Sequence, residues 1–298
     1  MSLQIGAVFP TCEIGNDPAA IRDYAQAAEE LGYSHITTYD HVLGAVHDDR
    51  EPTLMGPYRE TDPFHEPFVL FGYIAALTQR IRMVTGVLIL PQRQTALVAK
   101  QAAELAVLSE GRFTLGVGTG WNWVEYEALG EDFASRGPRL TEQVGLLREL
   151  WEAPVVTFEG EHHRVARAGL LPLPPSPIPI WMGGYSPPAI RRAARLGDGF
   201  LFGAAFTPML DLCGLLHAEL EKAGRTEGFE IDVILHFSEG EDAWRSLAEK
   251  WKAAGATHFS MRSMDTGVAL TGEKPAGFKT VQDHIGALER FIDVVRDV

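Results

Sequence analysis

Short apolar runs alternate with helical segments eight times along this chain of 298 residues. The runs are too apolar to leave one face of a sheet in water, and strands of this kind occur in parallel sheets covered by helices on both faces. They are Leu3–Phe9, Ser34–Tyr39, Arg82–Leu90, Arg112–Gly118, Ile178–Met182, Gly199–Phe202, Phe229–Phe237 and Thr257–Met261.

The segments between the runs carry apolar residues three or four positions apart, which is the spacing of one helix face. Ile21, Ala25, Ala28 and Leu31 mark the first of them. An open doubly wound sheet and a closed barrel both fit this alternation. Eight units followed by a final helix favour closure. We therefore predict an α/β protein, a (β/α)8 TIM barrel formed as a single domain by residues 1–298.

One stretch interrupts the alternation. Residues 154–179 contain too many prolines for a helix, and we interpret them as a small insertion before the fifth strand. Within it, Val155–Phe158 and His162–Val165 are predicted to form a hairpin. Two other long loops, Gly44–His65 and Arg262–Lys279, follow predicted strands. In a barrel both would lie at the face that carries active sites.

Composition excludes several classes of function. The net charge of −14, with no run of Lys or Arg, would repel a nucleic acid. Cys12 and Cys213 stand far apart, which argues against a disulfide framework or a zinc site and fits a reducing cytosol. The N-terminus lacks the features of a signal peptide, and no apolar run approaches the roughly 18 residues of a membrane span. We expect a cytoplasmic protein that binds neither nucleic acid nor membrane.

The fourth predicted strand ends in Gly116, Gly118 and Gly120 and is followed by a segment that can form a helix. Glycines let a backbone approach a ligand, and a helix N-terminus attracts anions, so the turn is a candidate phosphate cradle. A tight turn without any ligand explains the same residues equally well. The turn is not the dinucleotide fingerprint, because the third glycine of G-x-G-x-x-G would fall on Trp121.

A second glycine pair, Gly183-Gly184, follows the fifth predicted strand, with Ser186 as a plausible N-cap of the next helix. Taken alone, this pair is more simply an ordinary turn. Together the two turns would place backbone amides on neighbouring strand ends, where the phosphate arm of a cofactor could lie between them.

Asp40-His41 ends the second predicted strand. A histidine there could accept a proton near neutral pH, and the adjacent carboxylate could orient it. A surface pair or a helix cap is the alternative. Although His47 and Asp48 lie nearby, their order matches no common ligand spacing, so no metal is predicted.

Taken together, these segments resemble the bacterial luciferase-like superfamily and, within it, the branch that uses the deazaflavin coenzyme F-420. The matching stretches are YDH at Tyr39–His41, TGVLILPQRQTALVAKQAAELAVLSEGRFTLGVGTGWNWVEYEALG at Thr85–Gly130, RGPRLTEQVGLLRELW at Arg136–Trp151, and PIWMGGYSPPAIRRAARLGDGF at Pro179–Phe200. The resemblance implies a (β/α)8 barrel with an insertion before the later strands.

The resemblance also implies roles for particular residues. Gly86 and Val87 would form the family's bulge, often a non-proline cis peptide pressed against the cofactor ring. The phosphate arm would lie along the turn Gly118–Gly120, and the segment with Trp181, Gly183 and Gly184 would form the opposite wall. The implied site residues are Asp40 and His41 beside ring and substrate, and Gly86, Val87, Gly118, Thr119, Gly120, Trp181, Gly183 and Gly184 around the cofactor.

At one position the sequence differs from the pattern of the F-420 branch. Its sugar-phosphate dehydrogenases carry a glutamate directly after the GTG, where this chain has Trp121. We therefore do not expect that activity, and the indole suggests a more apolar substrate pocket.

The sequence thus predicts an oxidoreductase acting on a small organic substrate, with F-420 as the hydride carrier and a homodimer as the expected assembly. The residues alone do not separate F-420 from FMN, so an FMN-dependent monooxygenase stays open. A non-catalytic flavin-binding protein on the same fold also stays open. An NAD-dependent dehydrogenase with an open sheet is disfavoured by the missing third glycine.

Overall fold

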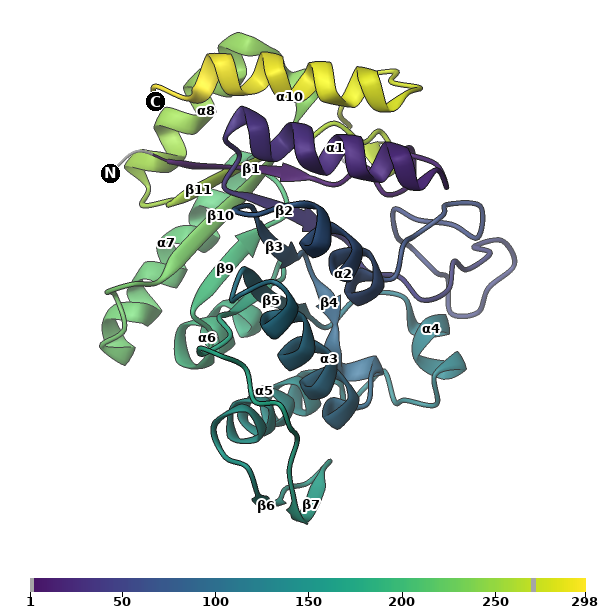
Figure 1. The fold of residues 1–298 in the computed structure, drawn as a ribbon, viewed down its shortest axis with the longest axis vertical. Helices are drawn as coiled ribbons and strands as arrows, with labels where there is room; N and C mark the ends of the chain where they lie inside the picture. The colour runs from purple at the N-terminus through teal and green to yellow at the C-terminus, as the bar shows by residue number, and fades with distance from the viewer. Residues whose placement is uncertain (1–2, 269–271) are drawn as a thin grey trace.

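Eight parallel strand positions close into a barrel, as the alternation predicted (Figure 1). The structure is a computed structural model that describes residues 3–268 and 272–298; residues 1–2 and 269–271, the latter in the predicted loop Arg262–Lys279, lie outside the described part. The barrel strands are β1 (Gln4–Val8), β2 (His35–Thr38), β3 (Arg82–Thr85) with β4 (Leu88–Ile89), β5 (Phe113–Gly118), β8 (Ile180–Gly183), β9 (Gly199–Phe202), β10 (Glu230–His236) and β11 (His258–Arg262).

The barrel closes because β1 pairs with β11 on one side and with β2 on the other, while β5 pairs with both β3 and β4. Each predicted apolar run overlaps one of these positions, and β8 and β11 each extend one residue beyond the predicted run. The third run, Arg82–Leu90, is divided, because the chain leaves the ladder at Gly86 and Val87 before β4 resumes the pairing with β5. A short 3-10 helix, η1 (Leu90–Gln92), follows β4.

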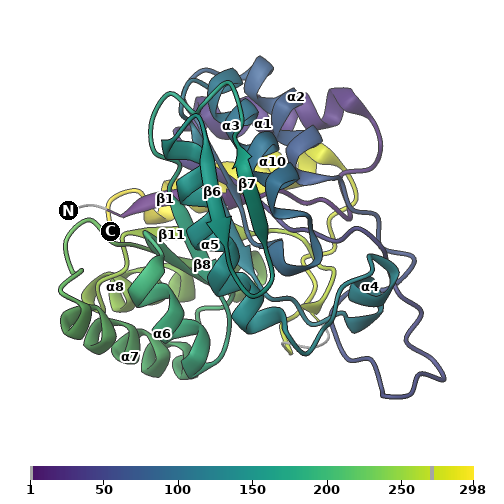
Figure 2. The ribbon, with the colours of Figure 1, turned by 90° about the horizontal axis from the view of Figure 1, so that it is seen from below.

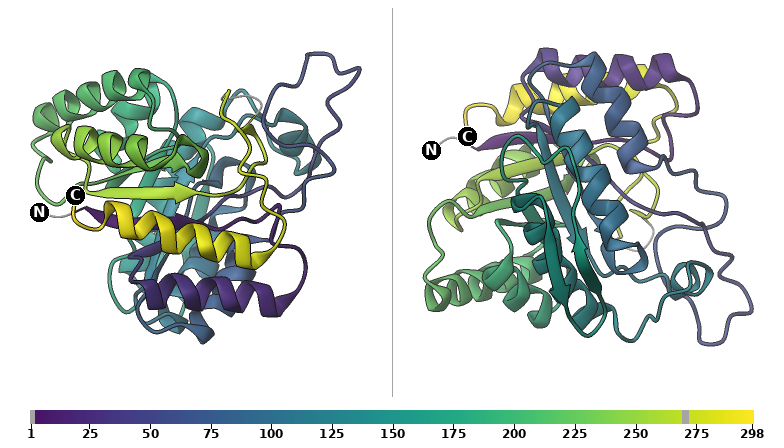
Figure 3. Two further views of the ribbon diagram at one scale, coloured as in Figure 1. Left: turned by 90° about the horizontal axis from the view of Figure 1, so that it is seen from above. Right: turned by 60° about the horizontal axis from the view of Figure 1, so that its bottom comes forward.

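Helices surround the barrel, and α1 lies beside α10, so the first and last helices close the outer layer (Figure 3). Asp17 caps α1 and Thr280 caps α10 through their side-chain oxygens. The helices are α1 (Pro18–Leu31), α2 (Pro67–Leu77), α3 (Thr95–Leu108), α4 (Trp123–Ala128), α5 (Arg136–Glu152), α6 (Pro187–Leu196), α7 (Thr207–Ala223), α8 (Glu241–Ala253) and α10 (Val281–Val295), with a 3-10 turn, η2 (Phe237–Glu239), before α8.

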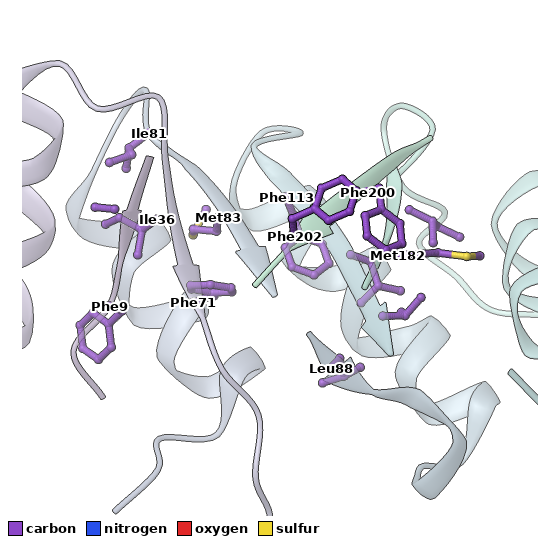
Figure 4. Packing of buried hydrophobic residues seen from close by; sticks show 14 of the residues in the cluster. Phe9, Ile36, Phe71, Ile81, Met83, Leu88, Phe113, Met182, Phe200 and Phe202 are labelled. Carbon is purple, nitrogen blue, oxygen red and sulfur yellow. The ribbon is translucent and has the colours of Figure 1, made fainter. Parts of the chain in front are cut away.

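Two apolar layers result from the alternation of side chains along each strand. Outward residues such as Phe113 and Met83 pack against the helices, where Phe71 of α2 meets Phe113 with ring centroids 6.4 Å apart (Figure 4). Inward residues form a separate cluster inside the barrel: Val8, Val84, Trp181, Leu201 and Ile234. A barrel filled in this way is a packed core rather than a channel.

The proline-rich insertion forms the predicted hairpin from β6 (Val156–Glu159) and β7 (Arg164–Ala168). The second strand begins two residues later than the sequence indicated. The hairpin lies across α5 (Figure 2), where Glu142 accepts hydrogen bonds from the backbone of Glu161 and His162. His163 bridges Glu142 and Thr95, with its ring nitrogens 2.7 and 2.8 Å from their side-chain oxygens.

In the described ranges, 3–268 and 272–298, none of the helices combines the length and the apolar character that a membrane crossing requires.

Candidate active site

A cavity of about 520 Å³ opens at the carboxyl ends of the barrel strands. Its walls also include the loop between β2 and α2, which lies with α4 on one side of the barrel (Figure 1). This is the end of a barrel where active sites are found. Nine of the ten predicted site residues line the cavity: Asp40, His41, Gly86, Val87, Gly118, Thr119, Gly120, Gly183 and Gly184.

Trp181 is the exception, because its side chain does not line the cavity. Its side chain is fully buried inside the barrel, where the indole nitrogen donates to Glu230 at 3.1 Å and the Arg82 guanidinium lies 5.1 Å from the ring. Trp181 and Gly183 point to the same side of β8, but two residues of strand separate them by about 7 Å. Trp181 therefore fills the layer below the cavity.

The bulge at Gly86-Val87 is a non-proline cis peptide, as predicted. It explains two of the glycines that the sequence singled out. A Cβ on Gly118 would lie 2.4 Å from Val87 Cγ2, and one on Gly183 would lie 2.8 Å from Val87 Cγ1. Any side chain at these positions would collide with the bulge, so close packing alone requires both glycines.

The backbone amides expected at the two glycine turns are only partly available. Gly120 has φ +62°, a left-handed conformation that favours glycine, and its turn leads into α4. After β8, however, α6 begins with Pro187 and Pro188, which have no N–H to donate. The second turn therefore offers fewer amides than expected, although Gly184 and Ser186 still line the cavity.

Asp40 is a positioning carboxylate. Its side chain is completely buried and accepts from Ile89 N at 2.9 Å and from Arg93 Nη2 at 2.6 Å. Arg93 also pairs with Glu66 at the start of α2. These bonds join the end of β2 to the strand that follows the bulge. The expectation that Asp40 orients His41 is therefore not supported, because its oxygens are used elsewhere.

Glu125 is the partner of His41. The His41 Nδ1 atom lies 2.9 Å from Glu125 Oε2, and Glu125 Oε1 accepts from the backbone N–H groups of Val42 and Leu43. The carboxylate is buried, on the first turn of α4, with Asn122 as N-cap. When Nδ1–H donates to the carboxylate, Nε2 is left as an unprotonated acceptor. This nitrogen is the one available to a ligand in the cavity.

Aromatic rings enclose His41. The centroids of Tyr58, Phe64 and Trp121 lie 5.1, 4.9 and 5.4 Å from that of the imidazole. Gly56 packs directly on the indole, because a Cβ there would lie 2.2 Å from Trp121 Cζ3. Trp121 therefore lines the cavity and packs beside the histidine.

A third group of polar side chains lines the cavity at the end of β11. Arg262 is buried and hydrogen-bonds with Tyr39, and it interacts electrostatically with Tyr58 and Tyr185. Burial raises the pKa of Tyr39 to about 12 and that of Tyr58 well above its usual value, so both stay hydroxyls at neutral pH. Within the part of the chain that the structure describes, no cluster of His, Cys, Asp or Glu could hold a metal ion.

Sequence reasoning missed Glu125 and Arg262. Asn122-x-x-Glu125 has the spacing of a capping box, in which the acid would bond to the N-cap residue. This pattern gives no indication that the Glu125 carboxylate instead contacts His41. Arg262 gave a usable signal, because a charged residue at the carboxyl end of a barrel strand is typical of an active site. In the sequence, however, Arg262 stands as the first residue of a predicted long loop.

Comparisons with known proteins identify the family of the chain and relatives of its fold. An uncharacterised protein of Mycobacterium tuberculosis is 40% identical over 216 residues, or 70% of this chain and 74% of that protein. An F420-dependent glucose-6-phosphate dehydrogenase of Nakamurella multipartita is 34% identical over 237 residues, or 78% of this chain and 66% of that protein.

A solved structure described as "F420-dependent secondary alcohol dehydrogenase in complex with an F420-acetone adduct" has the same fold, with a TM-score of 0.73 and 99% of each chain covered at 19% identity. The model of the luciferase-like monooxygenase family matches residues 4–276. The chain therefore belongs to the luciferase-like monooxygenase family of oxidoreductases.

Proposed function

We propose that this protein is an F-420-dependent oxidoreductase that moves a hydride between the deazaflavin and a carbinol or carbonyl carbon of a small organic molecule. The observation that carries the proposal is the His41–Glu125 pair, which engages Nδ1 and leaves Nε2 for a ligand in the cavity that Gly86 and Val87 also line. The F420-dependent relative at 34% identity supports the choice of cofactor.

The residues present fit such a cofactor. A volume of about 520 Å³ lies within the range of small-ligand sites, about 300–1,000 Å³. Val87, Ile89 and Leu201 give the cavity an apolar surface on which a flat ring could pack. Gly118–Gly120, Gly183 and Gly184 would hold the phosphate arm, because they leave backbone where side chains would otherwise project. Bound there, the deazaflavin would supply a carbon that accepts or gives a hydride.

The chain's own residues would move the proton. His41 Nε2 accepts the hydroxyl proton when the substrate is oxidised and returns it in the reverse direction. Glu125 holds the imidazole in the required tautomer and stabilises its charged form, as the buried carboxylate of a catalytic triad does. Trp121 and Tyr58 keep water away from the histidine. Because Trp121 replaces the acid of the sugar-phosphate enzymes, we do not propose activity on glucose 6-phosphate.

Titration of the purified protein with F-420 and, separately, with FMN tests the proposal. Quenching of tryptophan fluorescence reports binding, because Trp121 lines the cavity. We expect F-420 to bind at least about tenfold more tightly than FMN, a difference of about 1.4 kcal/mol. Tighter binding of FMN would favour an FMN-dependent monooxygenase, and binding of neither would contradict the proposal.

A further inference from the structure

Arg262 is the only lysine or arginine side chain that lines the cavity among the described residues. It ends β11, and only 8% of it is exposed. A buried guanidinium beside a ligand cavity is costly unless anionic partners compensate its charge. The identity of those partners therefore bears on what the cavity binds.

Only some of the N–H donors of the Arg262 guanidinium have partners among the described residues. Nη2 forms an ion pair with the carboxylate of Glu273, and the Tyr39 hydroxyl is a second partner. Nε is buried and has no partner among the described residues. Because arginine has five N–H donors in a fixed planar arrangement, these two contacts leave donors for a further acceptor.

The surroundings suit an oxyanion. The hydroxyls of Tyr39 and Tyr58 remain protonated at neutral pH and can donate to a bound anion. The Tyr58 ring lies 6.3 Å from that of Tyr39 and 5.1 Å from that of His41, so it joins the arginine end of the cavity to the histidine end. A ligand that passes Tyr58 would reach both groups.

We propose that Arg262 binds the carboxylate of the substrate, and that the substrate class is a hydroxycarboxylic acid or the corresponding oxo acid. This inference rests on the proposed function, since it requires the carbinol carbon at His41 and the carboxylate at Arg262. Glu273 shows that the guanidinium pairs with a carboxylate, and we expect the carboxylate of the substrate to compete with Glu273 for its N–H donors. Glu273 is thus an internal competitor for the anion site.

Two substitutions with opposite effects test the inference. Arg262→Gln removes the charge, so KM for straight-chain hydroxycarboxylates should rise about ten- to a hundredfold, the range expected for charge-assisted hydrogen bonds. KM for the methyl esters of the same acids should change little. Glu273→Gln removes the competitor and should lower KM for the acids. Arg191→Gln, on the exposed face of α6, is the matched control and should leave both unchanged.

A binding measurement without cofactor separates this inference from the proposed function. Calorimetric titration with hexanoate should show binding to the wild-type protein, weaker binding to Arg262→Gln and tighter binding to Glu273→Gln, with hexanoate methyl ester unaffected. Arg262→Lys, which keeps the charge, should bind hexanoate better than Arg262→Gln does, even if both variants are less stable. F-420 affinity, measured by fluorescence, should be nearly the same in all of them.

Equal KM values for acid and ester in wild type and Arg262→Gln would overturn the inference while leaving the proposed function intact. A loss of F-420 affinity in Arg262→Gln with unchanged hexanoate binding would also overturn it, because the anion would then belong to the cofactor. Failure of the wild-type protein to use F-420 with any substrate would refute the proposed function, whereas the hexanoate titrations would still decide the anion site.

Discussion

At the scale of single residues, the candidate site depends on pairs that the sequence separates widely. Val87 leaves no room for a Cβ at Gly118 or Gly183, so both must be glycines. Glu125 engages Nδ1 of His41 and so leaves Nε2 for a ligand. In both cases a residue distant in the sequence explains the role of the residue that the sequence identified. The sequence identified the glycines and the histidine but gave them partly different reasons.

The packing of Val87 predicts that Gly183→Ala destabilises the fold by about 1–3 kcal/mol, the usual cost of overpacking. Val87→Ala in the same chain should remove most of this cost, because the new Cβ would then have room. Urea unfolding of the single and double variants measures the coupling. Gly214→Ala, on α7 where a Cβ meets nothing within 4 Å, is the control and should be neutral or slightly stabilising. Additive effects of Gly183→Ala and Val87→Ala would contradict the account.

The bond between His41 and Glu125 predicts that Glu125→Gln lowers kcat and shifts the pH dependence of kcat, because an amide cannot stabilise the charged imidazole as a carboxylate does. Glu125→Asp should recover part of the rate. A Glu125→Gln variant that turns over more slowly with an unchanged pH profile would indicate that Glu125 is only structural. The profile is measured with whichever alcohol or hydroxy acid the wild-type protein oxidises.

At the scale of elements, the strands and the hairpin of the insertion were predictable, whereas side-chain contacts between distant segments were not. Each apolar run became a barrel strand because burial on both faces needs an uninterrupted apolar segment. The cis peptide at Gly86-Val87 was predictable from a glycine inside a run together with the bulge that the family resemblance implies. The place of Trp181 was not, since the sequence near Gly183 does not say at which depth of the barrel a side chain lies. Contacts across the chain, such as that from Glu125 to His41, have no local signature.

The Glu142 carboxylate makes several of the contacts that hold the insertion. Glu142 receives two backbone N–H groups of the hairpin and the His163 ring, so Glu142→Ala should loosen β6 and β7 without unfolding the barrel. Limited proteolysis should then cut between residues 156 and 168 faster than in the wild-type protein, with an unchanged circular dichroism spectrum. Glu149→Ala, at an exposed position of α5, should not change the cleavage. Equal cleavage of both variants would show that other contacts hold the hairpin.

At the scale of the whole molecule, stability should depend on buried histidines at opposite ends of the barrel. Burial lowers the pKa of His258 to about 4, with His35 contributing, and burial lowers that of His284 to about 4. The unfolded chain protonates these groups near pH 6.5, before the folded chain does. Stability should therefore fall as the pH drops from 6.5 and level off near pH 4, by up to about 3 kcal/mol for each histidine.

Urea unfolding between pH 4 and 7 measures this loss. His284→Gln should reduce the pH dependence, although the substitution itself costs stability. A pH dependence that is the same in His284→Gln and in the wild-type protein would mean that this histidine does not contribute.

The homodimer expected from the sequence is a separate prediction for the whole molecule. Two-fold dimers are the commonest homo-oligomers of soluble proteins. Sedimentation at micromolar concentration should show a dimer, and a monomer over the whole concentration range would contradict it.

We propose above all that His41 acts in the chemical step and that the Gly118–Gly120 turn binds the cofactor. Turnover and F-420 affinity, measured separately in two variants, test it most directly. His41→Asn should lower turnover by about 10²–10⁴-fold with nearly unchanged F-420 affinity. Gly120→Val should first weaken F-420 binding, because it places a side chain against Ile89 in a left-handed turn. If His41→Asn turns over as fast as the wild-type protein, the histidine is structural and the account is wrong.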